Sequence, residues 1–242
     1  MSPDPDPFIV AASLEGVPAA FSASRDGIDA LLRDRGLRRT TPEDTARSLL
    51  LGAAANARLE GDDVDADALT AGEGNPTSQA ALRLSGQLLG TVPAWRRAPL
   101  QVIARLHSVA ASGSAPDDEL GRPSNPEGTA RLAELGKALV TPTTAPGLVV
   151  AALAHAEIIA AGAFDSHNGI VARAVERIVM VSTGVDPASV TVPEAAHAEA
   201  PKAYRHMVHE YATGGPDGVH QWLLYAAEVY TRAAELSPVA RR

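Results

Sequence analysis

The chain has 242 residues, a formal net charge of −8 and no cysteine. This length fits one large domain or two small ones, and the lack of thiols excludes disulfides, thiolate catalysis and zinc–thiolate sites. The acidic balance and the lack of a basic stripe argue against a nucleic-acid partner, because phosphate backbones are bound by clustered Lys and Arg.

The sequence shows neither a signal peptide nor a membrane-spanning segment. Residues 1–16 lack the positive start and the apolar stretch of a signal peptide. The most apolar run, 148–163, includes His155 and Glu157 and is too short to span a bilayer. We therefore expect a cytoplasmic protein with no membrane partner. The positive residues are almost all arginine, a usage typical of GC-rich bacterial genomes of actinobacterial type.

Helical periodicity recurs along the chain, and no segment shows sustained alternation. We expect residues 1–12 to be extended, a first helix at 24–35, and a second that starts with Thr41 as its N-cap and Pro42 and runs to about Leu59. Further helices are predicted at 77–89, 99–111, 129–140, 145–161, 169–183, 201–213 and 216–236. The sequence thus predicts an all-α protein with an N-terminal extension and helix (1–40), one main domain (41–236) and a tail (237–242).

One long irregular stretch interrupts this pattern. Residues 112–128 contain Gly, Pro, Ser and Asp at the density of turns. A loop of this length within a compact domain is more often functional than idle. We therefore treat 112–128 as a candidate functional loop.

Residues 154–187 are the most informative segment. They indicate a buried helix, a short polar loop that ends in Asn168-Gly169, and a second helix whose N-terminus would favour an anion. The layout resembles the signature of Fic-domain proteins, H-P-F-x-[DE]-G-N-G-R-x-x-R, which GAFDSHNGIVAR at 162–173 matches without a gap. The resemblance covers about residues 40–235 and implies the all-α, Fic-like (Fido) fold. It also places 112–128 where that family has its flap, with room for a short β-hairpin.

Several working residues of the signature are missing. The resemblance places the family's catalytic His at Gly162, its magnesium-binding acid at Ser166 and its first Arg at Ile170. Gly cannot accept a proton, Ser is a poor Mg²⁺ ligand, and Ile cannot hold a phosphate. We therefore expect no catalytic residue, no metal and no cofactor, ATP and Mg²⁺ included. The retained Asn168, Gly169 and Arg173 are the candidates for binding an anion or nucleotide.

A second family feature is an inhibitory helix of the form [ST]-x-x-x-E-[GN]. Residues 56–61, NARLEG, have this form with Asn in place of Ser or Thr. The resemblance implies that Glu60 pairs with Arg173. This pair either locks the site or is a structural ion pair that ties an early helix to the core.

Other polar residues have two interpretations each. His167 and Asp165 lie in the signature loop and are candidates for a displaced base and acid, or are solvated surface residues. His155, on the buried helix, is interpreted as a core histidine rather than a ligand. His206, His209 and Glu210 share a helix with Lys202 and Arg205, which indicates a solvated face rather than a metal site.

The sequence therefore predicts a degenerate Fic-like protein that is inactive in AMP transfer and acts as a protein-binding or regulatory scaffold. One alternative is an active transferase of altered chemistry (nucleotidyl, phosphoryl or glycosyl) that uses the same groove. Another is a sensor of a phosphorylated metabolite. A protein partner is expected in the leading interpretation, and a homo-oligomer is compatible with all three.

Overall fold

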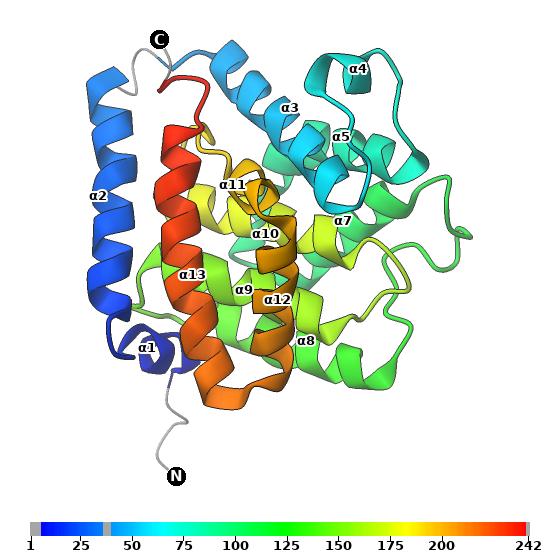
Figure 1. Cartoon of the computed structure of the whole chain (residues 1–242). Coiled ribbons are helices and arrows are strands. Elements are labelled where there is room, and N and C mark those ends of the chain that lie inside the picture. The colour runs from blue at the N-terminus through cyan, green and yellow to red at the C-terminus, as the bar shows by residue number, and fades with distance from the viewer. Residues whose placement is uncertain (1–5, 36–39, 241–242) are drawn as a thin grey trace.

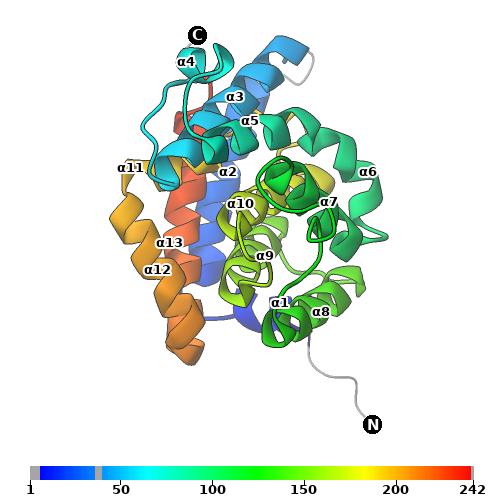
Figure 2. The same ribbon diagram turned by 90° about the vertical axis from the view of Figure 1, so that its right-hand side faces the viewer.

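Two buried helices, α9 (Gly147–Ala161) and α10 (Asn168–Ser182), pack against each other in the middle of the molecule (Figure 1 and Figure 2). The computed structural model describes residues 6–35 and 40–240. The residues of α9 are apolar on every face of the helix, and most of its side chains are buried. This is the pattern of a helix that other helices enclose. These two helices therefore form the centre to which the other elements attach.

The other helices form a shell around this pair. On one side α2 (Val17–Arg35) packs along α13 (Gly215–Glu235), which also contacts α12 (Pro201–Thr213). On the other side lie α7 (Pro99–Ala111) and α8 (Pro126–Val140) (Figure 2). Across the top of Figure 1, α3 (Pro42–Leu59) contacts α5 (Pro76–Leu88) and α11 (Pro193–Glu199). The short elements are α1 (Pro7–Ala12), α4 (Ala66–Thr70), the 3₁₀ turn η2 (Leu89–Thr91) and α6 (Val92–Trp95).

The all-α prediction is confirmed, and so is the predicted start of α3. The Thr41 hydroxyl accepts a hydrogen bond from the Asp44 N–H at 3.3 Å, and the Asp44 carboxylate accepts one from the Thr41 N–H at 3.1 Å. This reciprocal capping box satisfies two N–H groups that a helix start leaves unpaired. The local sequence was therefore sufficient to place this helix end.

The prediction for the N-terminal segment was wrong. Residues 7–12 form α1 instead of an extended strand, and α2 begins at Val17 rather than at residue 24. The Asp6 carboxylate caps α1 by accepting from the Phe8 N–H at 2.9 Å, and the Phe8 side chain is buried in the core. Tertiary burial stabilises a helix that is too short to be recognised from periodicity. The short helices α6 and α11 were missed for the same reason.

The loop at 112–128 contains no hairpin. Among residues 6–35 and 40–240, its β pairing is limited to an isolated bridge between Ser112 and Ala115. The expected domain boundary after residue 40 adjoins residues 36–39, which lie outside the described residues, as do the last two residues of the expected tail. Within the described ranges, no helix is both long and apolar enough to cross a membrane.

Candidate functional site

The signature segment folds as a tight loop between α9 and α10. Gly162 ends α9 in the left-handed conformation, with φ of 49°, and its N–H donates to the carbonyls of Ile158 and Ile159. His167 precedes α10 and is also left-handed, with φ of 61°. A left-handed glycine at a helix end is common because it lacks a Cβ, whereas a histidine there is less usual. Both ends of the loop are therefore sharp turns.

Asn168 shapes this loop from within. Its Oδ1 accepts from the Phe164 N–H at 3.1 Å, and its Nδ2 donates to the Phe164 carbonyl at 2.6 Å. The Phe164 ring is buried and stacks on the His107 ring, with centroids 4.1 Å apart. The Asn168 amide thus closes the turn between α9 and α10 with hydrogen bonds to one residue.

Arg173 is buried in the first turns of α10, and its guanidinium has three partners. Nη2 donates to Glu60 Oε1 at 2.5 Å, Nε donates to Asn56 Oδ1 at 2.5 Å, and Nη1 donates to the Tyr204 hydroxyl at 3.0 Å. Burial opposes the charge on Arg173, but the neighbouring Tyr204 and Glu60 hold its pKa above the usual range. The cation is therefore tied to α3 and α12 at the same time.

The Glu60 carboxylate lies against the start of α10. A Cβ added to Gly169 would come within 2.8 Å of Glu60 Oε1, so only a glycine permits this approach. The first turn of a helix attracts anions, because its N–H groups are unpaired and its dipole is positive there. Glu60 therefore lies beside the first turn of α10 while it accepts from Arg173.

The three positions at which this chain differs from the working residues of the signature have different surroundings. Gly162 is half-buried at the end of α9, and the Ser166 hydroxyl lies 2.7 Å from His167 Nδ1. Ile170 is fully buried and belongs to the main hydrophobic core. Asp165 is exposed, and burial lowers the pKa of the half-buried His167. His167 and Asp165 therefore lie at the rim of the loop.

His107, on α7, is a site residue that no motif or spacing in the sequence indicated. Its Nδ1 accepts from the Gly121 N–H at 3.0 Å, and its buried Nε2 has no hydrogen-bond partner. Burial, with help from the charge of His167, lowers the pKa of His107 to about 4. His107 lines a small cavity of about 110 Å³ together with Asp165 and Ser166. A neutral imidazole thus faces a space that fits a few water molecules.

The loop at 112–128 contacts the signature loop near its end and forms hydrogen bonds to it. The Ser124 N–H donates to the Ala163 carbonyl at 2.7 Å, and Asn125 Nδ2 donates to the Gly162 carbonyl at 2.7 Å. A Cβ on Gly128 would lie 2.4 Å from the Ala161 carbonyl oxygen, so α8 begins in close contact with the end of α9. This loop is therefore held by hydrogen bonds to the signature backbone, and its role as a flap stays a prediction.

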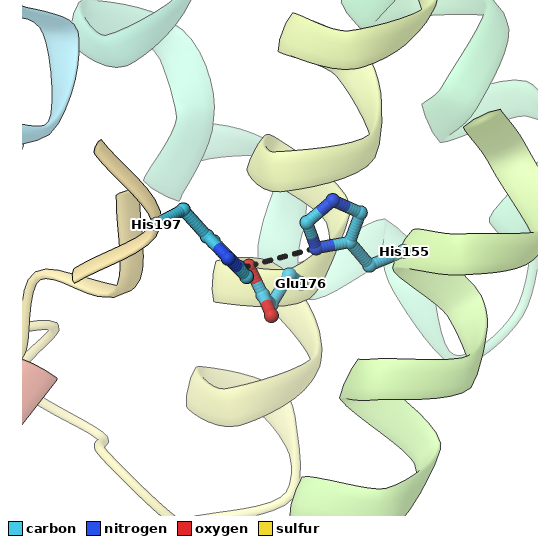
Figure 3. Close-up of side chains that lie close together, drawn as sticks. All are labelled: His155, Glu176 and His197. Atoms are coloured by element: carbon cyan, nitrogen blue, oxygen red, sulfur yellow. Dashed lines mark ion pairs between the residues drawn. The ribbon is translucent and has the colours of Figure 1, made fainter. Parts of the chain in front are cut away.

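A second group of polar side chains lies deeper, between α9, α10 and α11. Figure 3 shows His155, Glu176 and His197 turned toward one another, each fully buried. His155 Nε2 lies 2.8 Å from the Tyr204 hydroxyl, which also accepts from Arg173. The group therefore lies next to the Arg173 network. The sequence indicated a core histidine at 155 but neither of its two partners.

Comparisons with known proteins identify the fold. No family model and no curated protein matches the sequence. Among solved structures, a Fic family protein from Desulfovibrio desulfuricans G20 superimposes with a TM-score of 0.74 at 14% identity, covering 89% of this chain and 73% of the other. Fic-1 from C. elegans superimposes with a TM-score of 0.64 at 14% identity, covering 93% and 78%. A glutamate-to-glycine variant of that protein gives the same TM-score at 15% identity. The chain therefore has the Fic fold, as the signature at 162–173 predicted.

Proposed function

We propose that this chain is a Fic-fold protein that does not transfer AMP, has its anion site closed by Glu60, and acts by binding a protein partner. The observation that carries the proposal is the position of the Glu60 carboxylate. It lies 2.5 Å from Arg173 Nη2 and against Gly169 in the first turn of α10. A phosphate would have to displace this carboxylate to reach the same donors.

The signature itself supports inactivity in AMP transfer. Gly162 has no group that could take a proton from a target hydroxyl, and general-base catalysis contributes about 10²–10⁴-fold. The Ser166 hydroxyl is engaged with His167, and Ile170 is buried in the core. A base, a metal ligand and a phosphate clamp are thus missing from one loop.

An open apolar groove supports a binding role. It has a volume of about 890 Å³ and lies between α1, α8 and α9, with the ends of α12 and α13 at its border. Its rim includes Val10, which is 52% exposed. Apolar depressions of this size are typical of surfaces that bind a ligand or a protein. The groove is separate from the signature loop, so partner binding would not require an open anion site.

A transferase of altered chemistry is the second candidate, and one observation favours it. His107 Nε2 is unpartnered, its imidazole is neutral at pH 7, and it shares a cavity with Asp165 and Ser166. Because Nδ1 accepts from the Gly121 N–H, Nε2 carries the proton of the neutral ring and can donate a hydrogen bond to a group bound in the cavity. The cavity of about 110 Å³ is too small for a nucleotide unless the loop at 112–128 moves.

Thermal shift with inorganic phosphate and with ATP and Mg²⁺ tests the closed anion site. The wild-type chain should show no shift, whereas a ligand at 100 times its dissociation constant would add about 2.7 kcal/mol of stability. Glu60→Gly should gain a shift with phosphate, and the surface variant Asp63→Asn should not. A clear shift of the wild type by ATP would refute the closed site.

Labelled ATP and Mg²⁺ test the chemistry, and no labelled protein is expected. A labelled product that disappears in His107→Asn or His167→Asn would favour the altered transferase instead.

For partner binding, a photo-crosslinking residue in place of Val10 should give a discrete adduct in cells, while one at the exposed Gln101 of α7 should not. Equal results at both positions would remove the groove as support.

A further inference from the structure

Three side chains outside the signature loop meet in the interior of the protein. His155 Nδ1 lies 3.1 Å from Glu176 Oε2, and His197 Nε2 lies 3.5 Å from the same oxygen. All three atoms lie within 4.8 Å of one another, and all three side chains are fully buried (Figure 3). They come from α9, α10 and α11, so the cluster joins three helices.

The three facing atoms are unsatisfied. No hydrogen-bond partner is found for His155 Nδ1, Glu176 Oε2 or His197 Nε2, although both nitrogen atoms lie within 3.5 Å of the carboxylate oxygen. Buried polar atoms are paired in the great majority of cases, and an exception indicates a water or an ion at that place. Two nitrogen atoms and one oxygen atom therefore lie close enough together to contact a single ion.

The opposite atom of each side chain is held by a tyrosine. The three hydroxyl contacts are His155 Nε2 with Tyr204 at 2.8 Å, His197 Nδ1 with Tyr225 at 3.0 Å, and Glu176 Oε1 with Tyr230 at 2.9 Å. Histidine ligands of metals almost always have their second ring nitrogen fixed by such a contact, and ligating carboxylates are hydrogen-bonded as well. The cluster has this outer layer complete.

The buried Glu176 carboxyl group has no Lys or Arg side chain paired with it in the described residues. Within residues 6–35 and 40–240, no Lys or Arg nitrogen lies within 4.0 Å of Glu176. Buried carboxylates are usually paired with a cation or bind a metal.

We propose that His155, Glu176 and His197 bind one divalent transition-metal ion, with Zn²⁺ as the best match. Two imidazoles and one carboxylate are ligands that Zn²⁺ accepts, whereas Mg²⁺ and Ca²⁺ prefer oxygen alone. Bonds of about 2.0–2.1 Å in a tetrahedron separate neighbouring ligand atoms by about 3.3 Å. The separations of 3.1 and 3.5 Å lie on either side of that value.

This ion has a structural role. The three ligands are fully buried, so a substrate has no access to them. The ion fixes His155, His155 contacts the Tyr204 hydroxyl, and that hydroxyl accepts from Arg173. Metal binding therefore holds α9, α10 and α11 together and stabilises the position of the signature arginine.

Metal analysis of the tag-free full chain, purified from zinc-containing medium, tests the proposal. Elemental analysis should find about one equivalent of Zn²⁺ per chain, since such sites bind tightly once folded. Glu176→Gln should lose it, and the control His209→Asn, which changes an exposed histidine on α12, should keep it. Addition of a strong chelator should lower the melting temperature of the wild type, and Zn²⁺ but not Mg²⁺ should restore it.

Tyr225→Phe covers the case in which Glu176→Gln does not fold. It keeps all three ligands and removes the hydroxyl that contacts His197 Nδ1. Loss of such an outer contact typically weakens metal binding by about 10–100-fold, which competition with a chromophoric chelator measures. The proposal is overturned if the wild type carries no metal and its melting temperature responds to neither chelator nor Zn²⁺. Zn²⁺ retained at wild-type affinity in Glu176→Gln would also overturn it.

Discussion

Replacement of Glu60 by Ala tests how strongly Arg173 depends on this one partner. The Arg173 side chain is only 2% exposed, whereas that of Glu60 is 31% exposed. Removal of one member of a fully buried ion pair costs about 3–5 kcal/mol, because the other charge remains buried. Water reaches Glu60, and Asn56 and Tyr204 still contact the guanidinium, so we expect a loss of about 2 kcal/mol in the free energy of unfolding.

Urea unfolding of Glu60→Ala and of a matched control measures this loss. The control is Asp63→Ala, which removes an exposed pair with Arg58 at 2.9 Å and should cost about 0–1 kcal/mol. Inorganic phosphate should stabilise Glu60→Ala but not the control, because the freed Arg173 and the start of α10 can then hold an anion. Equal losses in the two variants, with no specific effect of phosphate, would refute both the buried pair and the closed site.

Three further predictions concern His107 and two glycines. The folded-state pKa of His107, about 4, lies below the unfolded value of 6.5. Its neutral form therefore favours folding above pH 6.5, and this stability is lost as the pH falls toward 4, by at most about 1.4 kcal/mol for each pH unit. His107→Asn, which can still accept from Gly121, should flatten the dependence of urea unfolding on pH between 7 and 5; an unchanged slope would contradict the pKa. Gly162→His should give no labelled product with ATP and Mg²⁺, because Ser166 and Ile170 remain, and at φ of 49° it should also cost about 1–3 kcal/mol in thermal unfolding. Robust labelling would show that the rest of the site is competent. Gly128→Ala should cost about 1–3 kcal/mol, because its Cβ would lie 2.4 Å from the Ala161 carbonyl oxygen. Its control Gly86→Ala meets nothing within 4 Å and should be neutral or stabilising, so equal effects of the two would count against the close packing of α8.

The helices that the sequence predicted are those with local signals. Thr41 and Pro42 start α3 by capping chemistry that is complete within four residues. The long α13 has a period of apolar residues that reveals its buried face. The segment at 7–12 has a capping signal in Asp6 and Pro7 but is too short to show a period, and its Phe8 side chain is buried against residues far along the chain. Long-range packing, which no local pattern encodes, decides such short elements.

The candidate site divides in the same way. Glu60 and Arg173 could be proposed as partners because the resemblance supplied both motifs, and the structure places their side chains in contact. The cluster of His155, Glu176 and His197 is spread over three helices, with 21 positions from each residue to the next. No spacing rule brings them together. Only the packing of α9, α10 and α11 makes them neighbours.

The buried charges of α10 give Arg173 a structural role in addition to its place in the signature. Arg173, Glu176 and Arg177 lie within five positions of one helix and are all fully buried. Arg177 is bound by Glu194 of α11 through contacts of 3.0 and 2.5 Å, much as Arg173 is bound by Glu60 of α3. Loss of Arg177 would leave the buried Glu194 without its cation, at a cost of about 3–5 kcal/mol, whereas loss of Arg173 would leave the partly exposed Glu60. Arg173 joins α10 to α3 and α12 through these contacts, so its presence alone is no evidence that the chain binds a nucleotide.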